Sequence, residues 1–391
     1  MRVLMVDPGN YTPYYDYSLC KALTRTGCEV ELVTSVFLYD AVPYEGDFDV
    51  NYFFYKLFTY IASRLSFLKV SWLRKPLKAL EYPVNLAFFI EYVWRKRPDI
   101  LHFQWVVMPL VDYLMFKCLR ELGIRLVYTA HNLLPHEEKK WHKRQYSFLY
   151  HIVDSIIVHS NSNREELIKA FAVDSGKVHV IPQGNFSDFS GRVMTKETAK
   201  RALGLDPDQR AVLFFGLIKP YKGLEYLIKA FPAVKKKVPK AVLLIVGKSE
   251  DFSPYRALIH RLGIVESVIV QPRFISYKEI ATYFCAADLV VLPYIKTYQS
   301  AVLLMAYTFG RPVVTTATGG LPEVVEEGKS GYVVPPREEQ ELAEAICDIL
   351  SDDFKMSQMG YYARYLAETR YSWQNIARAT FEVYSSLVKG N

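Results

Sequence analysis

Short apolar runs alternate with longer helical patterns along the whole chain, and this alternation restricts the possible folds more than any other feature. In the first half, runs rich in β-branched residues occupy 2–6, 29–34, 99–104, 125–130 and 155–160. A second set begins after about residue 190, at 211–216, 241–247, 267–274, 288–294 and 311–317. Continuous apolar runs are typical of parallel strands that are buried on both faces, with helices as crossovers. The sequence therefore predicts the α/β class, with two doubly wound Rossmann-like domains facing each other across a cleft.

The length of 391 residues agrees with two domains. A segment rich in Gly, Ser, Asn and Asp at 181–193 predicts the junction between them. We expect an N-terminal domain over 1–188 with an insert at about 40–97, and a C-terminal domain over 189–370. The last segment, 371–391, is predicted to be a helix that packs back towards the N-terminal domain.

The cysteines and the N-terminus predict a cytoplasmic protein. The five cysteines show no metal-type or disulfide-type spacing, which is typical of reduced thiols. Met1 leads directly into the run at 2–6, so we expect no signal peptide. No run of about 18 uncharged apolar residues occurs, so we expect no transmembrane helix.

The net charge of +7 is concentrated in one segment. Residues 52–97 carry nine cations and two anions, a difference of +7, so the rest of the chain is balanced. Many aromatic residues lie between these cations, a combination that suits peripheral contact with an anionic membrane. An ordinary helical insert with solvated cations is the alternative. Nucleic acid is not an expected partner, because no nucleic-acid-binding motif occurs.

The stretch "FFGLIKPYKGLEYLIKAF" at 214–231 places cations at the end of a predicted strand. The strand ends at Gly216 and a helix is expected to begin near Gly223. Lys219 and Lys222 therefore lie in the connecting loop, at the edge of the sheet where doubly wound folds bind ligands. Both lysines suit phosphate oxygens, although two solvated loop residues would give the same pattern.

A second motif, "PYIKTYQSAVLLMAYTFGRPVV" at 293–314, follows another predicted strand. We expect its helix to run from about Gln299 to Phe309, with Ser300 as a possible N-cap. Free backbone N–H groups of residues 299–302, together with the helix dipole, would form an anion site. A capped helix without a ligand is the alternative. The lysines expected at the same sheet edge favour a diphosphate.

Two further loops carry candidate residues. His131 directly follows the run at 125–130, which would aim it into the cleft from the N-terminal domain. Gly319 and Gly320 permit close approach of the backbone to a ligand. Glu323 would either contact that ligand or accept from backbone donors in a first helical turn.

These motifs together resemble the retaining glycosyltransferases of sequence family 4, which have the GT-B fold. The resemblance rests on "FFGLIKPYKGLEYLIKAF", "SAVLLMAYTFGRPVVTTATGGLPEVVEEGKSGYVVPP" and "VHVIPQGN", and more loosely on "MRVLMVDPGN", "DILHFQW" and "VYTAHNLLP". It covers nearly the whole chain except the insert. It implies sugar transfer from a nucleotide-diphosphate-sugar donor, bound mainly by the C-terminal domain, to an acceptor on the N-terminal domain. No metal or other cofactor is implied.

The resemblance also implies residue roles. His131 matches the family's histidine near the donor sugar, and Lys222 matches its lysine on the donor diphosphate. The family's neighbouring arginine corresponds to Leu217, and we expect Lys219 to replace it. Ile275 matches the loop that holds the nucleotide base. The catalytic candidates are thus His131, Lys219 and Lys222.

The chain departs from the family at two places. The family's paired glutamates correspond to Thr297 and Met305, which leaves the donor sugar and the retention of stereochemistry open. The neutral run from Thr297 to Ser300 resembles a "QS"-type variant that reads sugar hydroxyls. The family's paired glycines near the N-terminus are reduced to Gly9. The residues expected to bind the donor are Gly9, Gly216, Ile275, Thr297, Tyr298, Gln299, Ser300, Ala301 and Glu323.

The predicted function is sugar transfer to a lipid-linked or polysaccharide acceptor at the cytoplasmic face of the plasma membrane, in cell-surface polysaccharide biosynthesis. A nucleotide-sugar epimerase or a phosphorylase on the same fold is one alternative. The missing glutamates also leave open a non-catalytic nucleotide-sugar-binding protein. The base, the acceptor, the linkage and the oligomeric state do not follow from the sequence.

Overall fold

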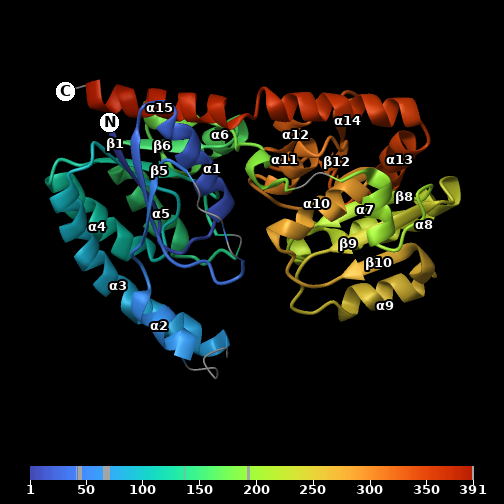
Figure 1. Ribbon diagram of the computed structural model, residues 1–391, viewed down its shortest axis with the longest axis horizontal. Coiled ribbons are helices and arrows are strands. Elements are labelled where there is room, and N and C mark those ends of the chain that lie inside the picture. Colours follow the sequence, from blue (N-terminus) through green and yellow to red (C-terminus); the bar gives the residue numbers. More distant parts are fainter. Residues whose placement is uncertain (41, 43–45, 65–70, 136, 192–193, 390–391) are drawn as a thin grey trace. The chain divides into compact units, whose positions relative to one another are not determined.

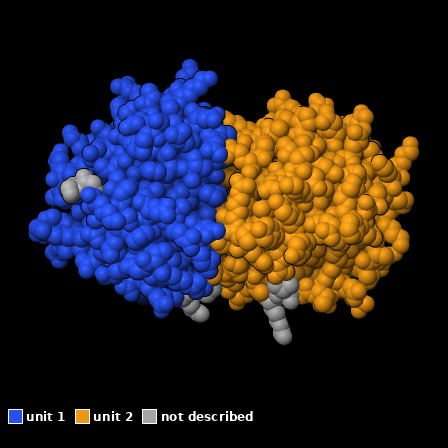
Figure 2. Space-filling model, turned by 90° about the horizontal axis from the view of Figure 1, so that it is seen from above, with its two compact units in different colours: residues 1–182, 373–391 blue, residues 183–372 orange. Residues whose placement is uncertain are grey.

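The computed structural model describes residues 1–40, 42, 46–64, 71–135, 137–191 and 194–389, without the side chains of 71–75. The chain forms two compact units (Figure 2). Unit 1 consists of residues 1–182 and 373–391, and unit 2 of residues 183–372.

Unit 1 is built on a parallel sheet of seven strands in the order β3-β2-β1-β4-β5-β6-β7 (Figure 1). Its strands are β1 (Arg2–Asp7), β2 (Glu29–Thr34), β3 (Asp49–Tyr52), β4 (Ile100–Phe103), β5 (Arg125–Thr129), β6 (Ser155–Val158) and β7 (Val178–Val180). Its helices are α1 (Pro13–Thr24), α2 (Lys56–Arg64), α3 (Ser71–Lys96), α4 (Pro109–Glu121), α5 (His142–Ile152), α6 (Asn161–Phe171) and α15 (Trp373–Lys389). Helices α1 and α15 pack together and share a core with β1 and β2.

Unit 2 contains a parallel sheet of six strands in the order β10-β9-β8-β11-β12-β13. Its strands are β8 (Arg210–Phe215), β9 (Ala241–Val246), β10 (Val268–Gln271), β11 (Leu289–Leu292), β12 (Val313–Thr316) and β13 (Gly331–Val334). Its helices are α7 (Lys196–Ala202), α8 (Leu224–Lys237), α9 (Ser253–Arg261), α10 (Tyr277–Ala286), α11 (Ala301–Thr308), α12 (Leu321–Val324), α13 (Glu339–Leu350) and α14 (Asp353–Glu368). Helices α8 and α13 bury their apolar faces on the central strands.

Both sheets are entirely parallel in their register, which confirms the predicted pair of Rossmann-like α/β units. All ten predicted strands are present within three residues at either end. The sequence analysis missed β3, β7 and β13, each of which lies at an edge of its sheet. These three strands have only three or four residues and pair with one neighbour each, so they lack the long apolar run of a strand that is covered on both sides.

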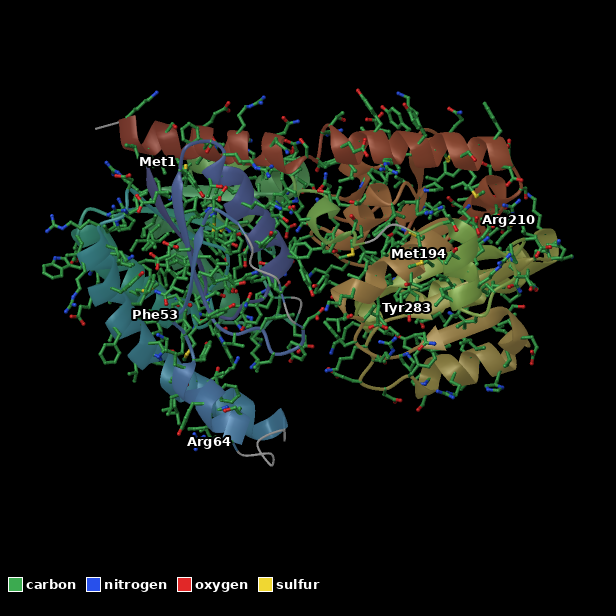
Figure 3. The ribbon with its side chains drawn as sticks, viewed as in Figure 1. Met1, Phe53, Arg64, Met194, Arg210 and Tyr283 are labelled. Carbon is green, nitrogen blue, oxygen red and sulfur yellow. The ribbon has the colours of Figure 1, made fainter. Side chains whose placement is uncertain are left out.

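The cationic segment at 52–97 forms the end of β3 and helices α2 and α3 (Figure 3). Of its cations, Lys69 and the side chains of Arg74 and Lys75 lie outside the described residues. Among the helices of the described part, none combines the length and apolar character needed to cross a bilayer.

Candidate functional site

In unit 2, the candidate site begins where β8 ends. Gly216 follows the strand with φ +107°, and a Cβ at this position would lie 3.1 Å from Nζ of Lys222 and 3.6 Å from Val302. Lys222 ends a short 3₁₀ turn, and Gly223 is the N-cap residue of α8. The glycine thus leaves room for the ammonium group of Lys222 directly above the end of the strand.

Tyr294 connects this lysine to the start of α11. Nζ of Lys222 donates to the Tyr294 hydroxyl at 3.2 Å, and that hydroxyl lies 3.3 Å from Oγ of Ser300. Among the described residues, no carboxylate forms an ion pair with Lys222. A cation and a helix N-terminus therefore lie side by side at the carboxyl ends of β8 and β11, an arrangement that suits an anion.

The loop before α11 is tightly fixed. Thr297, Tyr298 and Ser300 are buried, whereas Ala301 is exposed. Oγ1 of Thr297 donates to the carbonyl of Gln299 at 2.9 Å. Gly319, with φ +53°, allows the backbone to pass this loop, because a Cβ there would lie 2.0 Å from the carbonyl oxygen of Thr297.

The expected set of free amides at residues 299–302 needs a correction. Helix α11 begins at Ala301, and the amide of Ser300 donates to Oε1 of the Gln299 side chain at 3.0 Å. Gln299 competes for this donor because its flexible side chain folds back onto the following residue. Ser300 is the N-cap residue by position, but its side chain makes no capping hydrogen bond.

The structure separates Lys219 from Lys222. Nζ of Lys219 forms an ion pair with Glu250 at 2.8 Å, and Lys219 lines a cavity of about 530 Å³ with Tyr221 and Tyr255. Neither Lys222 nor Ser300 lines this cavity. The ammonium groups of the two lysines therefore have different partners, Glu250 for Lys219 and the Tyr294 hydroxyl for Lys222.

The remaining predicted residues of unit 2 lie at neighbouring strand ends. Ile275 is buried in the loop between β10 and α10. Glu323 is partly buried in the first turn of α12. Their predicted contacts with a base and a sugar stay predictions.

In unit 1, His131 is buried beyond the end of β5 and both of its ring nitrogens have partners. Nε2 lies 3.0 Å from Oε1 of Gln104, and Nδ1 lies 3.0 Å from Nε2 of His159. The ring stacks on Trp105 at 5.0 Å between centroids, and the edge of Tyr15 meets it at 4.9 Å. Burial, with His159 and His102 as further causes, lowers the pKa of His131 well below its ordinary value.

Three of these neighbours were missed by the sequence analysis. Gln104 and Trp105 directly follow β4, and His159 directly follows β6. Each has the same signal that identified His131, a polar or aromatic residue at the carboxyl end of a buried strand. Comparing all strand ends of the first half would have found them.

The end of β1 and the first turn of α1 carry a buried pair of carboxyl groups. Asp7 and Asp16 are fully buried, and Asp7 accepts from the amide of Thr12 at 3.1 Å. Burial raises the pKa of both groups, and their mutual repulsion raises that of Asp16 further. Gly9 lets the ring of Tyr11 fold over the loop, because a Cβ would lie 2.3 Å from that ring.

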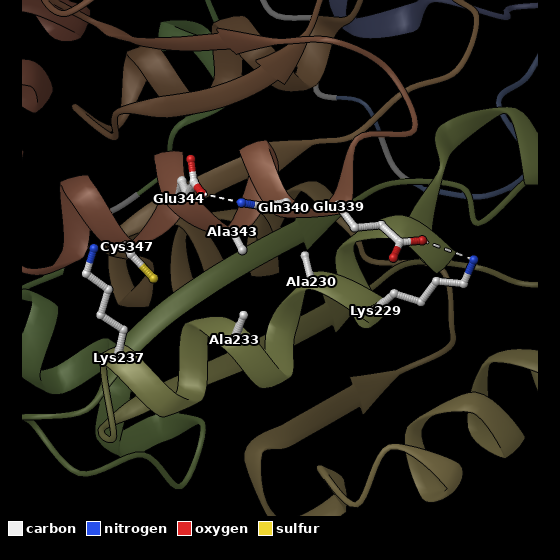
Figure 4. Close-up of a pocket in the computed structure, with 9 residues that line it drawn as sticks. All are labelled: Lys229, Ala230, Ala233, Lys237, Glu339, Gln340, Ala343, Glu344 and Cys347. Atoms are coloured by element: carbon white, nitrogen blue, oxygen red, sulfur yellow. Dashed lines mark hydrogen bonds and ion pairs between the residues drawn. The ribbon is translucent and has the colours of Figure 1, made fainter.

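A cavity of about 290 Å³ between α8 and α13 lies apart from these residues (Figure 4). Its walls include small side chains and an ion pair of 3.2 Å between Lys229 and Glu339. Its lining residues are Lys229, Ala230, Ala233, Lys237, Glu339, Gln340, Ala343, Glu344 and Cys347. None of the predicted site residues lines it.

Two Rossmann-like units with polar groups at the carboxyl ends of their strands define a protein of the GT-B class. Residues 15–184 match the family model Glycosyltransferase Family 4, and residues 195–365 match Glycosyl transferases group 1. The chain belongs to this family of glycosyltransferases.

Individual relatives support the same assignment. A D-inositol 3-phosphate glycosyltransferase of Corynebacterium urealyticum is 30% identical over 310 residues, covering 74% of this chain and 72% of the relative. An uncharacterized glycosyltransferase of Methanocaldococcus jannaschii is 27% identical over 375 residues, covering 94% and 92%. Among solved structures, Anabaena HepE in complex with UDP and glucose has a TM-score of 0.76 at 20% identity, covering 99% of this chain and 100% of HepE. This last likeness concerns the fold.

Proposed function

We propose that the protein transfers a sugar from a nucleotide-diphosphate-sugar to a lipid-linked or polysaccharide acceptor in cell-surface polysaccharide biosynthesis. The observation that carries this proposal is the cluster of Lys222, Tyr294 and Ser300 at the start of α11. The UDP and glucose bound to the structurally similar HepE agree with a donor of this class. The base and the sugar of this chain's donor remain open, as does the stereochemistry.

The proposed chemistry is electrostatic. Cleavage of the bond between sugar and phosphate leaves negative charge on the nucleotide diphosphate. A preorganised ammonium group and a helix N-terminus stabilise this charge as it develops. We assign this role to Lys222 and to the amides of Ala301 and Val302. Lys219 would contribute only after it leaves Glu250.

The other predicted residues would orient the donor. Thr297, Tyr298, Gln299 and Ser300 form the fixed loop before α11, where neutral groups can bind sugar hydroxyls. Ile275 would contact the base. Gly9, Gly216 and Glu323 complete the set proposed for donor binding, and His131 is proposed to act near the donor sugar.

Replacement of Lys222 tests the donor site. We expect Lys222→Ala to lower turnover with the nucleotide-sugar about 100-fold, the usual cost of losing one group that stabilises transition-state charge. The measurement is nucleotide release, with the donor chosen by a melting-temperature screen across nucleotide-sugars. Lys229→Ala is the matched control, because Lys229 lies within α8 and pairs with Glu339 of α13, and neither residue belongs to the predicted site. Normal turnover of Lys222→Ala would contradict the assigned role.

The same assays discriminate the alternative functions. A new nucleotide-sugar formed without any acceptor would favour the epimerase. Failure of every nucleotide-sugar to shift the melting temperature would remove the nucleotide-sugar proposals altogether.

We further propose peripheral contact with the cytoplasmic face of the plasma membrane through residues 52–97. Helix α3 exposes Leu80 (74%), Val84 and Phe88 (61%) at intervals of four residues, which places them on one helix face. Leu57 and Tyr60 are exposed on the adjoining α2. An exposed apolar face beside cations is the pattern of an interfacial helix on anionic lipid.

Vesicle sedimentation tests this contact. Phosphatidylglycerol-containing vesicles at moderate salt should pellet the protein, and Leu80→Ser with Phe88→Ser should abolish most of this binding, because each side chain contributes apolar area. Phe354→Ser is the control, since Phe354 is equally exposed (75%) but lies on α14 in unit 2. An absence of vesicle binding by the parent protein would rule the contact out.

A further inference from the structure

A chain of hydrogen-bonded side chains runs through the buried part of unit 1. Nδ1 of His102 lies 2.5 Å from the Tyr384 hydroxyl, and its Nε2 lies 2.7 Å from the Thr129 hydroxyl. The side chain of Gln104 joins two histidines. Its nitrogen Nε2 lies 3.4 Å from Nε2 of His102, and its oxygen Oε1 lies 3.0 Å from Nε2 of His131. The chain continues from Nδ1 of His131 to Nε2 of His159 at 3.0 Å. Each link restricts where the protons of the next group can be.

The end of this chain fixes the first proton. Nδ1 of His159 lies 2.9 Å from the backbone carbonyl of Ile181, which can only accept. His159 therefore carries its proton on Nδ1, and the neutral ring offers a bare Nε2. His131 must then donate from Nδ1, which leaves its own Nε2 bare when the ring is neutral.

The side chain of Gln104 decides whether Nε2 of His131 carries a proton. An oxygen facing Nε2 of His131 requires a proton there, so one of the two linked histidines is then a cation. With the amide turned by 180°, its NH₂ group donates to Nε2 and both rings are neutral. In the first orientation the NH₂ group faces the sulfur of Met5 at 2.8 Å, a weak acceptor, so rotation gives up only a weak hydrogen bond. After rotation the oxygen depends on an N–H of His102 as its donor, because a thioether sulfur cannot donate.

The other end of the chain accommodates both orientations. His102 meets a hydroxyl at each nitrogen, and a hydroxyl can either donate or accept. The His102 ring can therefore present a bare Nε2 to the NH₂ group of Gln104, or a protonated Nε2 to the Gln104 side-chain oxygen. Rotation of the amide leaves neither ring without a suitable partner.

We propose that Gln104 and His159 are positioning residues that hold His131 in its Nδ1–H tautomer and couple its protonation to rotation of the Gln104 amide. In the free protein the buried ring is neutral and the NH₂ group of Gln104 donates to Nε2. When an anion binds beside the ring, Nε2 takes one proton from solvent and the amide turns to the orientation in which Oε1 lies 3.0 Å from Nε2. The proton returns to solvent when the anion leaves. The second part rests on the proposed function, in which His131 acts near the donor sugar and the diphosphate attached to that sugar supplies the anion.

The titratable groups around the pair agree with a neutral resting state. His102 and His159 face His131 from β4 and β6, and Tyr15 faces it from α1. Burial lowers the pKa of His102 to about 3 and that of His159 to about 4. Burial raises the pKa of Tyr15 above its ordinary value, so this ring is also neutral.

Ring ¹⁵N spectra of the full chain test the tautomer without any substrate. Between pH 6 and 8 we expect His131 to show a protonated Nδ1 and a bare Nε2. Gln104→Glu should convert His131 to the imidazolium at pH 7, because a carboxylate can only accept from Nε2. A neutral ring protonated at Nε2 in the parent, or an unchanged His131 in Gln104→Glu, would overturn the proposal. Should Gln104→Glu misfold, His159→Gln serves instead, and loss of the single tautomer is then expected.

Titration in the presence of UDP tests the coupling to an anion. We expect bound UDP to raise the pKa of His131 by at least one unit, and His159→Phe to remove this shift. UDP that raises the melting temperature but leaves His131 unshifted would overturn the coupling while leaving the proposed function intact. UDP that does not bind would contradict a uridine donor, and the spectra of the free protein would still decide the tautomer.

Discussion

At the residue scale, the position of Lys222 depends on the glycine that follows it. Gly223 has φ +65°, and a Cβ there would lie 1.9 Å from the carbonyl oxygen of Pro293. The close passage of these two backbones brings the loop after β8 against the loop after β11. Lys222 and Tyr294 are the neighbours of this contact, so the glycine helps to set the distance between them.

Gly223→Ala should therefore be much more destabilising than an alanine at another left-handed glycine. The backbone conformation alone costs about 1–2 kcal/mol for a residue with a Cβ, and the clash adds about 1–3 kcal/mol. Gly263→Ala is the matched control, because Gly263 has the same φ of +65° and no atom within 4 Å of its Cβ position. Thermal unfolding of both variants measures the difference. Equal losses of melting temperature would show that the loops separate at little cost.

Single residues also mark the limit of prediction from the sequence. Lys222 could be predicted because it follows a strand and a glycine. The partners that decide a residue's chemistry could not be predicted, because they lie far away in the sequence. Glu250 lies 31 positions from Lys219, and His159 lies 28 positions from His131. Only the register of the sheet brings such residues together.

At the scale of elements, the central strands and the edge strand β10 were predictable, whereas the edge strands β3, β7 and β13 were not. A central parallel strand is covered on both faces and is therefore largely apolar, whereas β3 contains Asp49 and Asn51 and pairs with one neighbouring strand. The start of α11 differed by two residues from the prediction, because the side chain of Gln299 takes up the amide of Ser300. Side-chain competition for backbone donors leaves little trace in an apolar pattern.

Helix α4 has an unusual first turn whose stability should depend on pH. Asp112 is buried and accepts from the amides of Val107 and Met108 at 2.9 and 2.8 Å, and from the Tyr82 hydroxyl at 2.5 Å. Burial raises the pKa of Asp112 to about 7, although these three donors oppose the shift. The native carboxyl thus keeps its proton in a pH range where the unfolded chain has lost it.

The sign of the pH effect follows from this difference. Between the unfolded pKa of about 3.8 and the folded pKa of about 7, the native state binds the extra proton, so the free energy of unfolding falls as pH rises. The upper limit is about 4 kcal/mol, from 1.36 kcal/mol per pKa unit. The side chain introduced by Asp112→Asn cannot ionise. We therefore expect the melting temperature of this variant to fall less between pH 4.5 and pH 7.5 than that of the parent protein.

Asp352→Asn is the control for this experiment, because Asp352 caps α14 through the amide of Lys355 but is exposed. It should follow the parent's pH dependence. If Asp112→Asn also follows the parent, the carboxyl of Asp112 is ionised in the native protein throughout this range.

At the scale of the whole molecule, the chain leaves unit 1 after residue 182 and returns at residue 373. The two ends of unit 2 are hydrogen-bonded to each other. The backbone amide of Asn185 donates to the carbonyl of Tyr371 at 2.8 Å, and the side-chain amide of Asn185 donates to the carbonyl of Ala367 at 2.7 Å. Unit 1 is not continuous, because α15 contributes to its core. The buried residues of this helix in the shared core are Trp373, Ile376, Ala377, Val383 and Tyr384.

The two units should therefore differ when they are expressed as fragments. Residues 183–372 contain a complete sheet with its helices, and we expect this fragment to unfold cooperatively and to bind nucleotide. Residues 1–182 lack α15, which leaves the apolar face of α1 uncovered and removes the partner of His102 at Tyr384. We expect this fragment to aggregate or to lack a cooperative transition.

A third protein, in which a flexible Gly-Ser linker joins residues 373–391 to residues 1–182, tests whether an unstable fragment 1–182 is due to the loss of α15 or to the absence of unit 2. The linked version regains both the apolar cover over α1 and the hydroxyl beside His102, so a cooperative thermal transition should return. Replacing Trp373 and Ile376 by Ser in the linked version should abolish it again, because the helix would then bury polar groups. A fragment 1–182 that unfolds cooperatively by itself would show that α15 adds little to a core which the first 182 residues already complete.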